Sequence, residues 1–241
     1  MIWALAITAA ILIFSGESPF IVKDLDKYVK THVVDKSKSD KIIVLLKDAK
    51  SKRKEVSKKD AKFLKELDKM LQSRATQQTE FNDLLKRVLD AQTESQNTNI
   101  AVIKKVQDDI TPDEWAAIQK DIEKSLIKSD KDRLKHLKKA EIFYDKWSAK
   151  VAKTIADKEK NKLALEAIAR NKQVYIDNYK KVQAELMNPK SVMYKYKATE
   201  DELVQLRETI IKLITDVYES SVATHIELVK LTTEDEWKKI S

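Results

Sequence analysis

The sequence predicts an all-α protein in which a few long antiparallel helices form a helical bundle or coiled coil. Three observations support this fold class. The 241 residues include only one glycine, Gly16, and three prolines, so the chain has few residues suited to the tight turns of a sheet. Lys, Glu, Ala, Leu and Ile, which favour helices, are abundant. Apolar residues recur with the helical period, for example at Phe63, Leu64, Leu67, Met70 and Leu71.

The chain begins with an uncharged apolar run, Ile2–Phe14, which Gly16 and Pro19 then break. A helix of this length spans about 20 Å, which is shorter than the hydrocarbon core of a bilayer at about 30 Å. The length is typical of the apolar region of a signal peptide, although no basic residue precedes it. We therefore predict that residues 1–22 form an N-terminal anchor or signal segment that attaches the protein to a membrane. A buried helix of a soluble core is the alternative.

Terminal apolar segments of this kind usually export the chain that follows them. We therefore expect the body of the protein to lie outside the cytoplasm, in the periplasm or an equivalent compartment. Lys23, Lys27 and Lys30 follow the segment, and the positive-inside rule alone would place the body in the cytoplasm. Both orientations are kept as alternatives.

The remaining chain is predicted to form two helical halves, residues 23–118 and 119–241. In the first half, a polar connection leads into a long helix that ends at a break over Gln72–Thr79. A second helix follows and extends to Ile110. Its middle is unusually polar, with Gln92, Ser95, Gln96, Asn97, Thr98 and Asn99. Such residues set the register of a helix seam, line a wet groove, or lie in a locally looser stretch.

The second half is predicted to begin with a helix at Thr111 that is interrupted at Lys128–Arg133. One apolar stripe then runs from Ile142 to Leu186 and predicts a single helix that ends near Pro189. The last long helix is expected over Thr199–Lys230. A short capped segment closes the chain.

A phrase of the type Thr-x-Asp-Glu followed by an apolar residue occurs three times and predicts helix starts. In each copy the Thr is an N-cap, and the Glu three residues later completes a capping box, in which both side chains accept backbone N–H groups. The predicted capping residues are Thr111, Glu114 and Trp115, then Thr199 and Glu202, then Thr233, Glu236 and Trp237.

The copies at Trp115 and Trp237 stand 122 residues apart, and the helical segments before them align at the same offset. A tandem duplication of a helical hairpin is one explanation. The segments further upstream, residues 40–74 and 162–196, align poorly. Chance similarity between long helices is therefore the alternative.

Several chemistries are not expected. The chain has no cysteine, and its histidines, His32, His136 and His225, are isolated from one another. None has the i, i+4 partner of a helical metal site, and one glycine cannot build a phosphate-binding loop. We therefore predict no catalytic, cofactor-binding or metal site.

The net charge is +8, but only six of the 47 basic residues are arginines. Lys distinguishes bases less well than Arg, so specific nucleic-acid recognition is not expected. One basic run, in residues 50–62, predicts contact with a polyanion or with anionic lipid, and a solvated helix face is the alternative. Its basic residues are Lys50, Lys52, Arg53, Lys54, Lys58, Lys59 and Lys62.

These features predict a non-catalytic, membrane-associated helical protein that acts through contacts with other protein chains as a structural or assembly subunit. An extracytoplasmic binding or chaperone-like protein is the first alternative. Leu231–Asp235, with the sequence LTTED, resembles the L-T-x-x-Q phrases of small periplasmic stress chaperones, with Asp235 in place of Gln. A lysine-rich polyanion binder is the second alternative.

Overall fold

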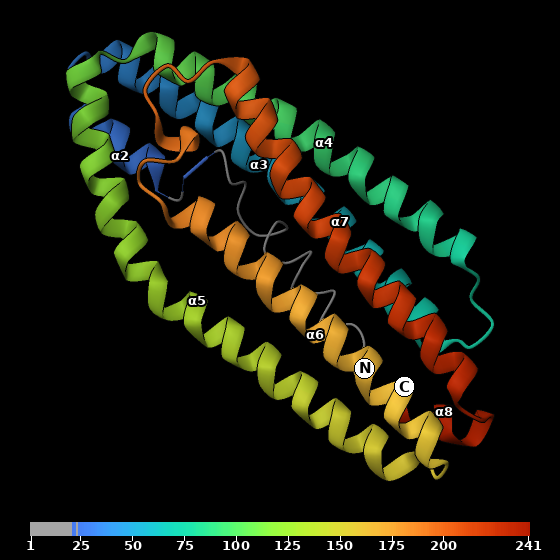
Figure 1. The fold of residues 1–241 in the computed structure, drawn as a ribbon. Helices are drawn as coiled ribbons and strands as arrows, with labels where there is room; N and C mark the ends of the chain where they lie inside the picture. The colour runs from blue at the N-terminus through green and yellow to red at the C-terminus, as the bar shows by residue number, and fades with distance from the viewer. Residues whose placement is uncertain (1–20, 23) are drawn as a thin grey trace.

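The computed structural model describes residues 21, 22 and 24–241. This part of the chain contains seven α-helices, one short 3-10 helix and no strand, which confirms the all-α fold class. The predicted apolar segment Ile2–Phe14 lies outside the described residues, and no described helix is both long enough and apolar enough to cross a bilayer. Numbered as in Figure 1, the helices are α2 (Leu25–His32), α3 (Lys36–Gln72), α4 (Gln78–Asp109), α5 (Pro112–Thr154), α6 (Lys158–Met187), η1 (Val192–Tyr194), α7 (Glu200–Leu231) and α8 (Glu234–Ile240).

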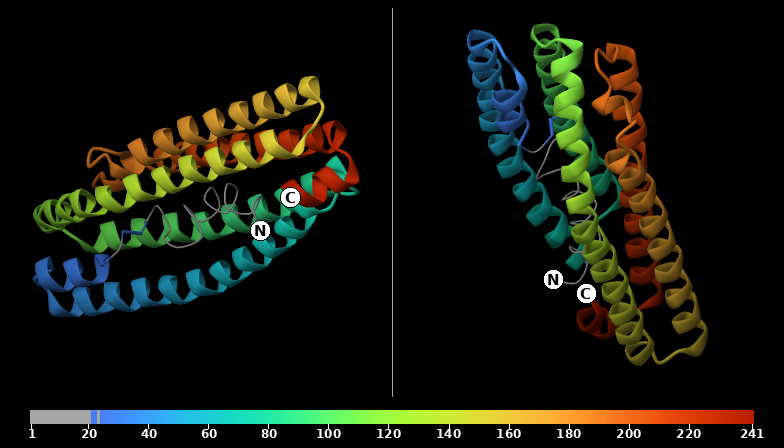
Figure 2. Two further views of the ribbon diagram at one scale, coloured as in Figure 1. Left: turned by 90° about the horizontal axis from the view of Figure 1, so that it is seen from below. Right: turned by 90° about the vertical axis from the view of Figure 1, so that its left-hand side faces the viewer.

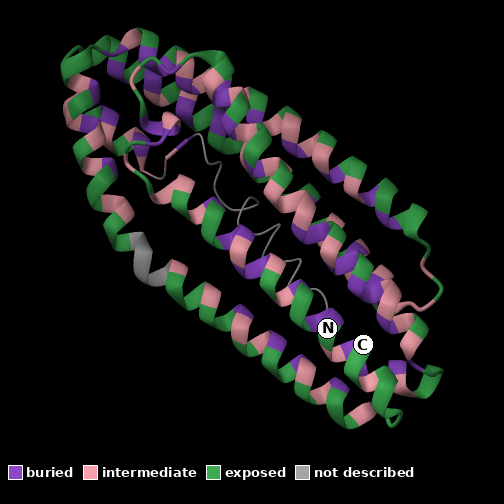
Figure 3. Ribbon diagram, in the orientation of Figure 1, coloured by how far each residue is buried: buried purple, intermediate pink, exposed green. Residues whose placement is uncertain are grey.

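The five long helices lie side by side in an elongated bundle (Figures 1 and 2). Helix α3 alone has 37 residues and is about 55 Å long at the usual rise of a helix. Helix α4 packs against α3 and α7, and α6 packs against α7 and α5. The short helix α2 joins α3 to α5 near one end, and α8 packs against α5 near the other. Buried residues follow the inner side of each helix (Figure 3).

Two predicted helix boundaries are wrong. Helix α5 continues without interruption through Lys128–Arg133, because this segment contains neither Gly nor Pro and its residues are compatible with a helix. The predicted single helix over Ile142–Leu186 is divided at residues 155–157, where α5 ends and α6 begins. The apolar stripe does not reveal this turn, because the helices before and after it both bury apolar side chains on the inside of the bundle. Asp157 caps α6 by accepting a hydrogen bond from the Lys160 backbone N at 3.0 Å.

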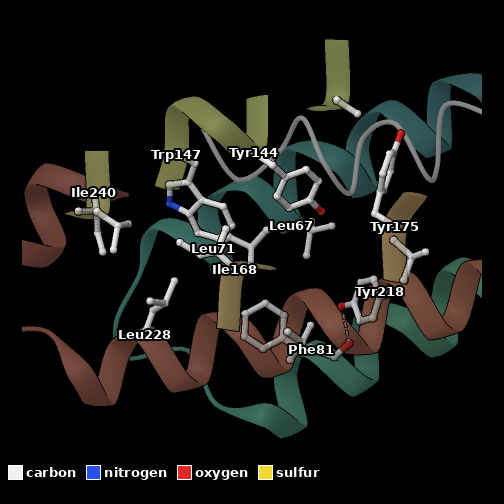
Figure 4. Close-up of a cluster of buried hydrophobic side chains, with 14 of the residues drawn as sticks. Leu67, Leu71, Phe81, Tyr144, Trp147, Ile168, Tyr175, Tyr218, Leu228 and Ile240 are labelled. Atoms are coloured by element: carbon white, nitrogen blue, oxygen red, sulfur yellow. Dashed lines mark hydrogen bonds between the residues drawn. The ribbon is translucent and has the colours of Figure 1, made fainter. Parts of the chain in front are cut away.

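Two hydrophobic cores fill the bundle, one toward each end. Leu71 and Phe81 of the first half pack in one core with Trp147, Ile168 and Ile240 of the second half (Figure 4). The other core combines residues of both halves in the same way, among them Leu25, Ile42, Trp115, Met193 and Leu203. Neither half therefore closes a core by itself.

The helix starts repeat at an offset of 122 residues. Helix α7 covers the positions that follow α4 by this offset, and α3 and α6 begin at equivalent positions, as do α5 and α8. The segments that align poorly in sequence therefore follow helix starts at equivalent positions, although α3 has 37 residues and α6 has 30. We call residues 25–118 the first unit and residues 147–240 the second unit. The middle of α5, residues 119–146, joins them.

Equivalent caps at the starts of α3 and α6 make the repeat testable. Asp35 accepts a hydrogen bond from the Lys38 backbone N at 3.1 Å, as Asp157 does from Lys160. We expect Asp35→Ala and Asp157→Ala each to lower the free energy of unfolding by about 1 kcal/mol, because each removes one N-cap. Urea unfolding followed by circular dichroism measures both. A loss at only one of the two positions would show that the two helix starts are not equivalent.

Candidate functional site

The predicted capping residues lie at helix starts. Thr111 Oγ1 accepts a hydrogen bond from the Glu114 backbone N at 3.3 Å, and Glu114 Oε2 accepts one from the Thr111 backbone N at 2.9 Å. Thr199 with Glu202 at α7, and Thr233 with Glu236 at α8, make the same pair of bonds. The repeated phrase therefore marks the turns at which the chain changes direction.

Two of the capping glutamates also bind a distant part of the backbone. Glu114 Oε1 accepts a hydrogen bond from the Val34 N at 2.9 Å, and Glu236 Oε1 accepts one from the Ala156 N at 3.3 Å. Val34 and Ala156 occupy equivalent positions, each one residue before the N-cap of a long helix. One carboxylate thus holds the start of its own helix and the start of the first long helix of the same unit.

The tryptophans that follow these glutamates bind the opposite unit. The Trp115 indole Nε1 donates a hydrogen bond to the Tyr194 carbonyl O at 3.0 Å, and the Trp237 Nε1 donates one to the Gln72 carbonyl O at 2.9 Å. Both indoles are buried. Each therefore contributes apolar packing and satisfies a backbone carbonyl at or near a helix end.

Arg74 and Tyr196 satisfy further helix-end carbonyls, and no motif in the sequence predicts either role. The Arg74 guanidinium donates to the carbonyl oxygens of Val229, Thr232 and Thr233 at 2.7–2.9 Å. The Tyr196 hydroxyl donates to the carbonyl O of Ile110 at 2.9 Å. These contacts join residues that are far apart in the chain, so only the folded arrangement reveals them.

The structure divides the basic run of α3 into two sets. The first recurs at every fourth residue and lies exposed along one side of the helix: Lys50, Lys54, Lys58 and Lys62. The second set lines a pocket of about 260 Å³ between α3 and α4: Lys52, Arg53 and Lys59. Lys52 and Lys59 are exposed as well, so every residue of the predicted basic patch except the half-buried Arg53 is exposed on α3.

The pocket combines cationic groups with neutral polar groups of α4. Ser95, Thr98 and Asn99 line it from α4, and cations beside hydroxyl and amide groups can hold an oxyanion. Two carboxylates, Glu55 and Glu94, also line the pocket and weaken its positive potential.

A buried carboxyl group lies between the same two helices. Asp60 is 1% exposed and accepts a hydrogen bond from Gln92 Nε2 through Oδ1 at 3.0 Å. Burial raises the pKa of Asp60 to about 6, and the hydrogen bond from Gln92 lowers it only in part. Gln96 follows Gln92 by about one helical turn. Its side-chain amide is also buried, and it has no hydrogen-bond partner. Part of the polar middle of α4 is thus enclosed in the bundle.

The histidines occupy three separate environments. His32 Nε2 lies 2.8 Å from Asp121 Oδ2, and His136 is exposed. His225 is buried, with its ring centroid 5.2 Å from that of Phe81 and 5.1 Å from that of Trp237. Burial lowers the pKa of His225 to about 4. Across the described residues, no group of three or more His, Asp or Glu side chains is placed to hold a metal ion.

The comparisons with known protein families, with curated proteins and with solved structures found no match to this chain. The function is therefore inferred from the residues of the chain itself.

The raised pKa of Asp60 predicts how stability depends on pH. The unfolded state loses this proton near pH 4 and the folded state near pH 6, so the free energy of unfolding falls as pH rises through this window. We expect Asp60→Asn, which cannot ionise, to gain stability relative to the parent as pH rises. The free energy of unfolding of the variant minus that of the parent is expected to be about 2 kcal/mol larger above pH 6 than at pH 4. Urea unfolding of both proteins from pH 4 to pH 8 measures this difference.

His225 titrates with the opposite sign, because its pKa is lowered on folding and its contribution to stability is lost as pH falls from about 6.5 to about 4. It is present in both proteins, so its effect cancels in the comparison. If the stability difference between Asp60→Asn and the parent is the same at every pH, Asp60 does not carry the raised pKa.

Proposed function

We propose that this protein is a non-catalytic scaffold that binds other protein chains and is attached to a membrane through Ile2–Phe14, with its body outside the cytoplasm. The observation that supports binding lies on the middle of α5. Ile127 is 76% exposed and Leu134 is 51% exposed. They are seven residues apart, so they point to the same side of the helix.

The surroundings of these two side chains favour a helical partner. Glu123, Lys138 and Glu141 lie on the same side of α5 at helical spacing, so charged residues flank the apolar pair. Apolar positions seven residues apart with flanking charges are typical of a helix surface that packs against another helix. A partner helix that covers Ile127 and Leu134 would remove both from water.

We also propose that the two units arose by tandem duplication of one helical hairpin. The matching helix starts and the paired caps at Asp35 and Asp157 support this origin. The middle of α5 is then the segment that joins the two copies.

Crosslinking in native membranes tests the proposed scaffold. A photo-crosslinking residue in place of Ile127 is expected to capture a discrete partner chain, and the additional substitution Leu134→Lys is expected to reduce that product at least tenfold, because it places a charge in the apolar contact. The matched control places the same crosslinker at Val44, which is 65% exposed on α3. The product is identified by mass spectrometry. Equal products from both positions, or no product from Ile127, would contradict a binding surface on α5.

The pocket between α3 and α4 favours a second candidate function, which is the binding of a polyanion. Heparin serves as the probe. Its dissociation constant is expected to rise steeply with salt, because the basic side chains displace condensed counterions from heparin when they bind. The double variant Lys52→Gln/Lys59→Gln is expected to weaken binding about tenfold more than the control Lys54→Gln/Lys58→Gln, whose side chains lie outside the pocket lining. Titrations from 50 to 300 mM NaCl measure both. Equal losses in the two variants would show that heparin responds to net charge alone.

A further inference from the structure

The bonds between the two units are reciprocal. Trp115 of the first unit donates to the carbonyl of Tyr194 in the second, and Trp237 of the second donates to the carbonyl of Gln72 in the first. The two donors are equivalent at the offset of 122 residues, and so are the two acceptors. A repeat related by simple translation would direct the second bond away from the first unit. Here it returns to the first unit, as in a dimer with two-fold symmetry.

A second pair of contacts has the same geometry but different side chains. The Arg74 guanidinium donates to the Thr232 carbonyl O at 2.8 Å, and the Tyr196 hydroxyl donates to the Ile110 carbonyl O at 2.9 Å. Arg74 and Tyr196 are equivalent positions, and so are Ile110 and Thr232. The donors differ in chemistry, yet each satisfies the end of a helix in the opposite unit.

The two hydrophobic cores follow the same relation. In one core, Leu84 of the first unit lies with Leu228 of the second. The other core contains the two equivalent positions with the units reversed, namely Leu206 of the second unit and Val106 of the first. Each unit thus supplies the region around its α3–α4 or α6–α7 turn to the core of the other. The surface between the units is therefore self-complementary.

The segment that joins the units reaches the cores only near its ends, through Ile122 in one core and through Ala140 and Tyr144 in the other, and none of the described residues between Ile122 and Ala140 is buried in either core. Ile127, Leu134 and His136 are exposed in the middle of α5, whereas Trp115, near its start, and Val151, near its end, are fully packed. The two ends of α5 belong to different units, and each packs within its own core.

We infer that the two units form a self-complementary pair, each fitting the other as a second copy of itself would, and that the part of α5 between Ile122 and Ala140 is a tether which the interface does not require. The inference rests on the reciprocal contacts and on the proposed duplication. It does not depend on the proposed scaffold function, because folding and association are measured without a partner.

The test is to cut the tether in the complete protein. A protease recognition sequence replaces residues 129–132, the protein is purified intact, and the site is then cleaved. The two fragments are expected to elute together from a size-exclusion column at the volume of the uncut protein and to keep its helical circular dichroism. The melting temperature is expected to become dependent on concentration only after cleavage. Separation or precipitation of the fragments on cleavage would overturn the inference.

Equivalent tryptophan variants distinguish a reciprocal interface from mere adhesion of the fragments. In the cut protein, Trp115→Phe and Trp237→Phe are each expected to raise the dissociation constant of the fragments about fivefold, since each removes one hydrogen bond between units. The control is Thr154→Val, which removes a hydroxyl that donates to the Lys150 carbonyl O within the second unit. Effects of the two Trp variants that differ by more than tenfold, or a Thr154→Val effect as large as theirs, would contradict two-fold equivalence. If the variants do not fold, the elution volume of the cut parent protein still shows whether the two fragments stay associated.

Discussion

The structure depends on how the ends of its helices are satisfied without glycine. Helices commonly end at a glycine in the left-handed conformation, which allows the backbone to pair its own last carbonyl groups. Gly16 is the only glycine and lies outside the described residues, and the residues that follow α3, α4, α5, α6 and α7 are extended. Carbonyl groups near these ends therefore need donors from elsewhere. Trp237, Arg74 and Tyr196 supply several of them from the opposite unit, and Trp115 does the same for the end of η1.

This solution couples local structure to assembly. In a chain with glycine caps, a helix can end without help from its neighbours. Here the turn that follows α3 is stabilised by Trp237, and the segment that follows η1 is stabilised by Trp115, so both turns depend on the two units being together. The helix starts are less dependent on the other unit, because Glu114 and Glu236 bind backbone groups within their own units. Helix starts are thus stabilised by contacts within a unit, whereas several helix ends are stabilised by contacts from the other unit.

Local signals were enough to predict part of this arrangement. The threonine caps at Thr111, Thr199 and Thr233 could be found because a capping box needs only four consecutive residues. The turn before Asp157 could not, because no Gly or Pro marks it and the apolar stripe continues on both sides. The helical period places Lys54 and Lys59 of the basic run on different sides of α3, and only the structure shows that Lys59 lines the pocket beside α4. The equivalence of Arg74 and Tyr196 is invisible in sequence, because only the position and the backbone target are shared.

The middle of α5 takes a smaller part in the contacts between the units than the rest of the bundle does. Helix ends and cores are completed by contacts between the units, and the segment between Ile122 and Ala140 lies outside most of these contacts. The fold therefore does not require apolar residues on its outer side, and the exposure of Ile127 and Leu134 costs free energy in water without a gain in packing. Charged residues at the same positions would be compatible with the helix and more soluble. A partner that covers these two side chains gives their apolar character a physical reason, and a tether that the cores do not need leaves room for that partner.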